Sequence, residues 1–335
     1  MAMILSTATA IDRDAAVARA VAQLHAGQVV ALPTETVYGL AANALDADAV
    51  TRIFAAKGRP AHNPIIVHVA DLDMARRVVA DWPASADRLA ARFWPGPLTM
   101  VLPRAPIVPD VVTGGGTTVG IRWPRHPIMQ AVIRACGFPL AAPSANRSNA
   151  VSPTTAAHVQ QSIGDRLDLI VDGGPSPVGI ESTVIDLAAS PPRVLRPGRI
   201  DAQALASVLD EPVATGPVSA VGVARSPGML ARHYSPRARL VISSWHDDAD
   251  LDGQIARLST PRTRTYVLAY DRVPRETDGL GVAMMPREAE AYAQRLYADL
   301  HRADDTGADV IIVEALPEGM AWDALRDRLV RAAAR

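Results

Sequence analysis

The segment from Lys57 to His68 gathers side chains that suit a negatively charged ligand. It reads Lys-Gly-Arg-Pro-Ala-His-Asn-Pro-Ile-Ile-Val-His, and Lys57 is the only lysine among the 34 basic residues of this 335-residue chain. An ammonium is a compact point charge that suits a phosphoryl group, whereas the guanidinium of arginine is a flat fork. Lys57 and Arg59 together therefore indicate phosphate binding, although a single lysine can also survive by chance in an arginine-rich chain.

Four further polar clusters lie at the ends of predicted strands: Thr34–Thr36, Thr117–Arg122, Ser144–Ser152 and Glu181–Thr183. Taken alone, one such cluster usually marks a turn or a helix cap. Strand ends of a parallel or mixed sheet converge on one crevice, so five clusters in one domain, counting that around Lys57, indicate a shared site. Their hydroxyl and amide groups, with the guanidinium groups of Arg122 and Arg196, could hold phosphate oxygens.

Several other chemistries find no support in the sequence. There is no Gly-x-x-x-x-Gly-Lys phosphate loop and no Gly-x-Gly-x-x-Gly dinucleotide pattern. Cys136 is the only cysteine, which excludes an intrachain disulfide and a cysteine zinc cluster, and its apolar surroundings predict a buried structural thiol. No cluster of histidines or carboxylates predicts a metal held by protein side chains, and a lone strand histidine such as His68 is more often structural. The residues alone thus predict an anionic, nucleotide-like ligand in an α/β cleft.

The overall composition predicts a soluble cytoplasmic protein. The formal net charge is −1, which gives no support for a broad nucleic-acid-binding surface. The N-terminal segment lacks the basic and apolar regions of a signal peptide. No apolar run approaches the roughly 20 residues that a membrane span needs, so we expect no membrane association.

The elements that position these clusters follow from residue periodicity and turn signals. Asp12 is expected to cap a first helix that ends at His25, and the helix that begins at Asp46 or Asp48 must end near Gly58 and Pro60. Further strands are predicted at 29–32, 64–70, 98–102, 119–122, 139–142, 169–171, 182–187 and 193–196, and further helices at 71–80, 84–92, 128–135, after Pro153 and at 201–209.

The chain changes character after residue 209. Residues 210–238 are rich in proline, glycine, serine and valine without a sustained period, which predicts a linker. From 239 onward strands alternate with helices, with strands expected at 239–244, 264–269, 281–285 and 309–315 and helices at 249–258, 287–303 and 321–334. We therefore predict a first domain at 1–209, a linker at 210–238 and a small doubly wound α/β domain at 239–335.

Seven segments, in order over about 5–200, resemble the YrdC-type threonylcarbamoyl-adenylate synthases in their longer two-domain form. They are Pro33–Leu40, Lys57–Pro60 with Asn63–Pro64 and His68, Trp94–Thr99, Val119–Arg122, Ala142–Asn146, Glu181–Val184 and Leu195–Gly198. Ser226–Met229 and His233–Pro236 are similar to the linker of that form. The resemblance implies a YrdC-like twisted, open mixed sheet with flanking helices, plus a small C-terminal Rossmann-like α/β domain.

The resemblance also implies an activity. A nucleotidyltransferase of this kind forms threonylcarbamoyl-AMP from L-threonine, bicarbonate or CO2, and ATP, with Mg²⁺ carried by the ATP, and releases pyrophosphate. Partner enzymes then transfer the threonylcarbamoyl group to an adenosine next to the anticodon of certain tRNAs. Whether this chain also contacts tRNA weakly and directly stays open.

Site residues are carried over position by position from the matching motifs. The expected L-threonine-binding residues are Thr36, His68, Arg122, Ala142 (through its backbone) and Ser182. The expected ATP-binding residues are Lys57, Arg59, Asn63, Thr118, Ser144, Ser152, Arg196 and, from the linker, Tyr234. Lys57 and Arg59 are also the expected catalytic residues, because offsetting the charge of a leaving pyrophosphate requires cations more than a strong base.

Two alternatives remain at this point. One is a carbamoyl-transferring maturation factor with a YrdC-like domain, but such chains add cysteine-rich zinc motifs that a single cysteine cannot supply. The other is an RNA-binding module without catalytic activity, which the near-neutral charge disfavours.

Overall fold

The chain folds into two compact units. The computed structural model describes residues 1–216, 232–275 and 279–334. Within these, the first unit holds residues 1–148 and 152–216, and the second holds 149–151 and 232–334. The linker motif Ser226–Met229 lies outside the described residues, so the predicted linker bounds remain a prediction.

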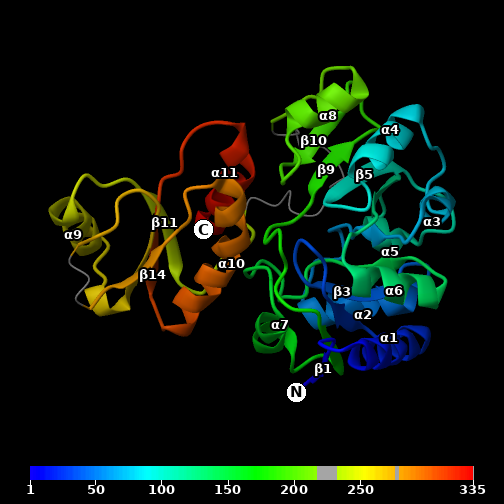
Figure 1. Ribbon diagram of the computed structural model, residues 1–335, viewed down its shortest axis with the longest axis horizontal. Coiled ribbons are helices and arrows are strands. Elements are labelled where there is room, and N and C mark those ends of the chain that lie inside the picture. Colours follow the sequence, from blue (N-terminus) through cyan, green and yellow to red (C-terminus); the bar gives the residue numbers. More distant parts are fainter. Residues whose placement is uncertain (217–231, 276–278, 335) are drawn as a thin grey trace. The chain divides into compact units, whose positions relative to one another are not determined.

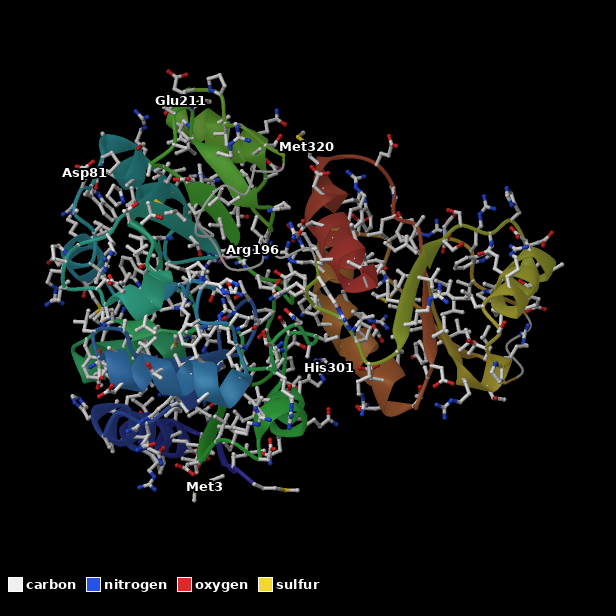
Figure 2. The ribbon with its side chains drawn as sticks, turned by 180° about the vertical axis from the view of Figure 1, so that it is seen from behind. Met3, Asp81, Arg196, Glu211, His301 and Met320 are labelled. Carbon is white, nitrogen blue, oxygen red and sulfur yellow. The ribbon has the colours of Figure 1, made fainter. Side chains whose placement is uncertain are left out.

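A mixed ten-stranded sheet forms the centre of the first unit. Its order is β1-β8-β2-β3-β7-β4-β6-β5-β9-β10, with parallel and antiparallel neighbours. The strands are β1 Met3–Ser6, β2 Val30–Leu32, β3 Gly39–Asn43, β4 Val67–His68, β5 Leu98–Pro103, β6 Thr118–Arg122, β7 Leu140–Ala141, β8 Leu169–Asp172, β9 Thr183–Asp186 and β10 Arg193–Arg196. β1 is one edge of this sheet, and its Met3 is 56% exposed (Figure 2).

Eight helices belong to the described part of this unit: α1 Ala10–His25, α2 Ala47–Lys57, α3 Leu72–Arg77, α4 Ala84–Phe93, α5 Asp110–Thr113, α6 Pro127–Cys136, α7 Ala156–Ile163 and α8 Ala202–Leu209. α1, α2 and α6 lie on the same side of the unit in Figure 1. Their inward residues, such as Leu24, Ile53 and Val132, are fully or almost fully buried in one aliphatic core with the strands. Aliphatic and alanine side chains thus fill this core, as the scarcity of aromatic residues requires.

The second unit is a three-layer α/β structure. Its four strands run parallel in the order β11-β14-β12-β13, namely β11 Arg239–Ser243, β12 Thr265–Ala269, β13 Gly281–Met284 and β14 Val310–Glu314. Its helices are α9 Asp248–Arg257, the short 3-10 helix η1 Arg262–Arg264, α10 Ala289–Asp305 and α11 Met320–Ala333. Figure 1 shows α9 on one side of β11 and β14, and α10 and α11 on the other. The predicted fold class, a mixed sheet plus a parallel Rossmann-like domain, is confirmed.

Three local expectations were wrong. The N-cap of α1 is Thr9, whose hydroxyl accepts from the Asp12 amide, so Asp12 belongs to the first turn. The strand expected at 64–70 is regular only at Val67–His68, because Pro64 has no N–H and the Ile65 amide bonds the Val112 carbonyl, which belongs to a helix. Two strands were missed, the short β1 and β3. The β3 sequence Gly-Leu-Ala-Ala-Asn lacks the β-branched residues that signal a strand.

No helix among the described residues has the length and apolarity that crossing a lipid bilayer would demand.

Candidate active site

The strand order of the first sheet brings the predicted threonine-binding residues together. β4 and β6 are parallel neighbours, and His68 pairs with Arg122 in their register. Ala142, directly after β7, bonds through its amide to Ile66, directly before β4. Thr36 precedes β3 and Ser182 precedes β9, so the site draws on several strand ends of one sheet.

Arg122 is the centre of a buried polar cluster. Its Nη1 donates to Thr36 Oγ1 at 2.9 Å and its Nε to the Gly96 carbonyl at 3.3 Å. Its Nη2 lies 2.8 Å from Glu35 Oε1, and both side chains of this ion pair are about 5% exposed or less. The guanidinium is therefore held in one orientation, as a residue that binds a carboxylate bidentately must be.

His68 is an uncharged imidazole at this site. Burial, together with the neighbouring Arg122 charge, lowers the pKa of His68 to about 3. Its Nδ1 has no hydrogen bond of good geometry within the described residues. A neutral imidazole beside Arg122 can hydrogen-bond a polar substrate without repelling the guanidinium.

Ser182 joins the threonine-binding and ATP-binding sets. Its hydroxyl lies 2.8 Å from Thr99 Oγ1 and accepts from Arg196 Nη2 at 3.0 Å. Arg196, the last residue of β10 (Figure 2), also donates to the Ser182 carbonyl through Nε and Nη2. A residue expected to bind ATP thus touches one expected to bind threonine, as joining the two substrates requires.

Lys57 is buried and bonded to the loop after β7. Its ammonium donates to the carbonyl oxygens of Ser144 and Asn146, each at 2.5 Å, and approaches Asn146 Oδ1 at 3.5 Å. Burial, with the nearby charge of Arg59, lowers the pKa of Lys57 well below its usual range. The three contacts match the three N–H groups of an ammonium, so Lys57 positions the Ser144 loop in this structure.

Arg59 and Asn63 lie beyond the end of α2. Asp46 caps the start of this helix, and Gly58 ends it in the left-handed conformation (φ 61°), which releases Arg59 from the helix. Arg59 donates from Nε to the Asn63 carbonyl at 3.2 Å and from Nη2 to the Pro64 carbonyl at 2.8 Å. Asn63 is 3% exposed, and its Nδ2 has no hydrogen-bond partner within the described residues. A buried unpaired amide calls for a polar partner, which a bound ligand can supply.

The remaining residues expected to bind ATP lie in three different places. Ser152 is fully buried and donates to Glu181 Oε1 at 2.6 Å. Thr118 opens β6, four residues before Arg122 on the same strand. Tyr234 belongs to the second unit, where it is fully buried and stacks on Tyr297 with ring centroids 5.9 Å apart.

The sequence predicts no role for four residues whose side chains contact the predicted set: Glu35, Thr99, Asn146 and Glu181. All four lie inside or beside the polar motifs of the sequence, so their position in the sequence was a signal that they belong to the site. A carboxylate in a turn otherwise made of threonines was the available signal for Glu35.

The sequence matches the profiles of two families. Residues 22–198 match the Sua5/YciO/YrdC profile, described as "Telomere recombination", and residues 200–334 match "Threonylcarbamoyl-AMP synthase, C-terminal domain". Together the two profiles account for nearly the whole chain.

Two curated relatives are similar over almost their full length. The threonylcarbamoyl-AMP synthase of Pyrococcus abyssi is 40% identical over 316 residues, covering 92% of this chain and 91% of the relative. The threonylcarbamoyl-AMP synthase of Bacillus subtilis is 40% identical over 330 residues, covering 96% and 93%.

Solved structures extend the likeness to three dimensions. Sua5 of P. abyssi complexed with L-threonine has a TM-score of 0.89 at 37% identity, covering 99% of this chain and 97% of that one. YciO of E. coli has a TM-score of 0.52 at 25% identity, covering 59% of this chain and 96% of its own. The chain belongs to the Sua5 family of two-domain threonylcarbamoyl-AMP synthases.

Proposed function

We propose that this chain forms threonylcarbamoyl-AMP from L-threonine, bicarbonate or CO2, and ATP. The amine nitrogen of threonine bonds the carbon of CO2 and loses a proton, which gives a carbamate. A carbamate oxygen then bonds the α-phosphorus of ATP while the bond from that phosphorus to the bridging oxygen breaks. Pyrophosphate leaves, and the adenylate remains.

Threonine is bound through its carboxylate at Arg122. The guanidinium is oriented by Thr36 and Gly96 in the structure, so little ordering remains when the ligand arrives. The hydroxyl of Ser182, the backbone at Ala142 and the neutral ring of His68 complete this half of the site. Neutral His68 also avoids adding a charge beside an amine that must be deprotonated to capture CO2.

ATP is bound by the cationic and hydroxyl groups around the same strand ends. Arg59 and Arg196 offset the charge of the pyrophosphate group, which a loose phosphoryl-type transition state requires. The unpaired amide of Asn63 and the hydroxyls of Thr118, Ser144 and Ser152 supply hydrogen bonds. Lys57 holds the Ser144 loop in place, and Tyr234 is the remaining residue of the expected ATP-binding set.

Mg²⁺ enters this account only with ATP. No group of three or more histidine, cysteine, aspartate or glutamate side chains that could hold a metal occurs among the described residues. Such a side-chain cage is not needed, because Mg²⁺ in nucleotide sites is commonly held by phosphate oxygens and water.

The observation that carries this proposal is the buried cluster of Arg122, Thr36 and His68, with Arg122 and His68 paired on adjacent strands. The test is to incubate the protein with ATP, Mg²⁺, bicarbonate and each amino acid in turn, and to measure pyrophosphate release. We expect release that depends on threonine and bicarbonate. Salt-dependent tRNA binding without such release would favour an RNA-binding module instead.

The product is a mixed anhydride of a carbamic acid and a phosphate, which water can hydrolyse. We propose that cytoplasmic partner enzymes pass its threonylcarbamoyl group to an adenosine next to the anticodon of tRNA. This role requires no membrane and no stable tRNA complex of the chain itself.

A further inference from the structure

Glu35 is a buried carboxylate that belongs to neither the expected threonine-binding set nor the expected ATP-binding set. It lies in the turn between β2 and β3 and is 4% exposed. Burial alone would raise the pKa of Glu35, but the Arg122 charge outweighs this effect and lowers the pKa below its usual value. Glu35 is therefore an anion, and a buried anion is tolerated only when it is paired.

The backbone around Glu35 is fixed from both sides. The Glu35 carbonyl accepts from the Val178 amide at 2.8 Å. The Thr34 hydroxyl donates to the Val37 carbonyl at 2.6 Å, and the Ser176 hydroxyl donates to the Thr34 carbonyl at 2.9 Å. The carboxylate thus projects from a rigid turn, which is what an orienting group needs.

The contacts of Arg122 leave a defined part of its guanidinium for a ligand. Arginine has five N–H donors in a fixed plane. Nε bonds Gly96 and one N–H of Nη1 bonds Thr36, while Nη2 lies 2.8 Å from Glu35 Oε1 in an ion pair that lacks hydrogen-bond geometry. Among the described residues, the second N–H of Nη1 and the N–H groups of Nη2 therefore remain, and two such groups are what a carboxylate accepts in a bidentate pair.

We infer that Glu35 is a positioning residue for the amino-acid substrate, which fixes the plane of Arg122 so that its remaining N–H groups meet the substrate carboxylate. This inference rests on the proposed function, in which Arg122 binds threonine. Glu35 itself does not touch the substrate in this account.

A purely electrostatic effect of Glu35 and a positioning role predict opposite changes in threonine affinity when Glu35 is replaced. Measuring that affinity therefore distinguishes the two. Two carboxylates near one guanidinium repel, so loss of Glu35 by charge alone should tighten threonine binding. If Glu35 instead orients Arg122, its loss lets the guanidinium rotate and weakens binding.

The experiment measures threonine and ATP affinities separately by titration calorimetry for Glu35→Ala and Glu35→Gln. We expect Glu35→Ala to bind threonine at least about tenfold more weakly. Glu35→Gln keeps a side-chain oxygen that can accept from Nη2 and should retain most of the affinity. Both variants should bind ATP like the unaltered protein. L-Threoninamide, which lacks the carboxylate, should bind all three proteins with similar affinity.

Asp186→Asn is the matched control. Asp186 is 1% exposed, lies at the far end of β9 and accepts from the Ala188 amide at 2.9 Å. Its replacement removes a buried carboxylate from the same unit and should lower the melting temperature without changing threonine affinity.

Each other outcome counts against the inference. Tighter threonine binding in both Glu35 variants would mean that Glu35 competes with the substrate for Arg122. Equal weakening towards threonine, threoninamide and ATP would mean a merely structural role. If the unaltered protein bound no threonine, the proposed function itself would fail, and this inference with it.

Discussion

The contacts of Lys57 require a compact ammonium and would not suit another basic side chain. Its three contacts converge on one tetrahedral nitrogen, from Ser144, Asn146 and the Asn146 side chain. A planar guanidinium is wider and longer and cannot place its donors on the same three oxygens. This explains, without an appeal to chance, why a chain with 33 arginines keeps one lysine here.

Lys57→Arg should therefore lower turnover although it preserves charge. We expect kcat/KM to fall at least about tenfold, which corresponds to about 1.4 kcal/mol. Steady-state pyrophosphate release measures it. The control is Arg52→Lys, a change of basic residue on the exposed face of the same helix, which should have little effect. Near-normal activity of Lys57→Arg would refute the role given to Lys57.

The neutral state of His68 predicts a pH dependence of stability. Its pKa of about 3 in the folded state lies below the roughly 6.5 of an unfolded histidine. The unfolded chain therefore takes up a proton that the folded one refuses. The free energy of unfolding should fall as pH drops from about 6.5 towards 3, by up to about 1.4 kcal/mol per pH unit.

His68→Asn should reduce this slope, and denaturant unfolding between about pH 5 and 6.5 measures it. In the folded protein Glu35 stays ionised over that window, because the Arg122 charge outweighs the effect of burial and lowers the pKa of Glu35 from 4.5. Replacing the exposed His62 by asparagine is the control. An unchanged slope in His68→Asn would show that His68 does not carry the effect.

At this scale the sequence predicts residue types better than it predicts contacts. The polar motifs predicted Arg122, Thr36 and His68 as neighbours, and the paired strands bring them together. The sequence did not predict that Glu35 would pair with Arg122, because an ion pair between residues 87 positions apart depends on strand order. For the same reason it did not predict that Lys57 would donate to the carbonyl groups of Ser144 and Asn146.

At the scale of elements, the end of α2 sets the position of Arg59 and Asn63, which are expected to bind phosphate. The chain leaves the helix at Gly58, whose amide bonds Ala55, while the Arg59 amide bonds Phe54. This C-cap separates Lys57, which points into the protein, from Arg59, which belongs to the following loop. The sequence predicted this helix end correctly because glycine and a nearby proline are strong local signals.

Gly58→Ala tests that C-cap. Gly58 has φ 61°, and an added Cβ would meet nothing within 4 Å, so the cost is backbone strain of about 1 kcal/mol. Gly137 caps α6 in the same conformation (φ 72°) and is equally open, so Gly137→Ala is a matched control. Both variants should lose similar stability in denaturant unfolding.

Only Gly58→Ala should raise KM for ATP, because only that cap positions Lys57 and Arg59. If the two variants changed KM for ATP equally, the C-cap of α2 would have no special part in the site.

At the scale of the whole molecule, the second unit holds the tyrosine expected to contact ATP. Tyr234 adopts the left-handed conformation (φ 62°), which is costly for a tyrosine and needs support. Tyr297 stacks on its ring, the Arg328 guanidinium lies 5.2 Å from its centroid, and the next residue, Ser235, bonds the Asn149 carbonyl. Asn149 stands in the sequence between Ser144 and Ser152, so a segment of the predicted ATP loop belongs to this support.

The contacts that hold the Tyr234 ring predict that the second unit contributes to ATP binding. Tyr297→Leu should weaken ATP binding several-fold, because it removes the ring that stacks on Tyr234. Tyr292→Leu is the control, since Tyr292 is an equally buried tyrosine of α10 that packs on Trp322 and Tyr270 instead. Both should cost about 2 kcal/mol of stability. Equal ATP affinity in the two variants would contradict the proposed part of Tyr234.

At this scale the alternation of strands and helices after residue 239 predicted the second domain, and the resemblance of the polar motifs implied the mixed sheet of the first. The grouping of residues 149–151 with the second unit could not be predicted, because it depends on a bridge between Ala150 and Ser235 that no local pattern signals.

The central claim is that this chain joins threonine, a one-carbon unit and AMP in one product. The most direct measurement is mass spectrometry of the nucleotide formed from ATP, Mg²⁺, L-threonine and ¹³C-labelled bicarbonate. We predict threonylcarbamoyl-AMP that carries the label in its carbamoyl carbon, and at least about tenfold less product with Arg122→Lys, which has no bidentate fork. Pyrophosphate release without this labelled adenylate, or no release at all with threonine, would contradict the account.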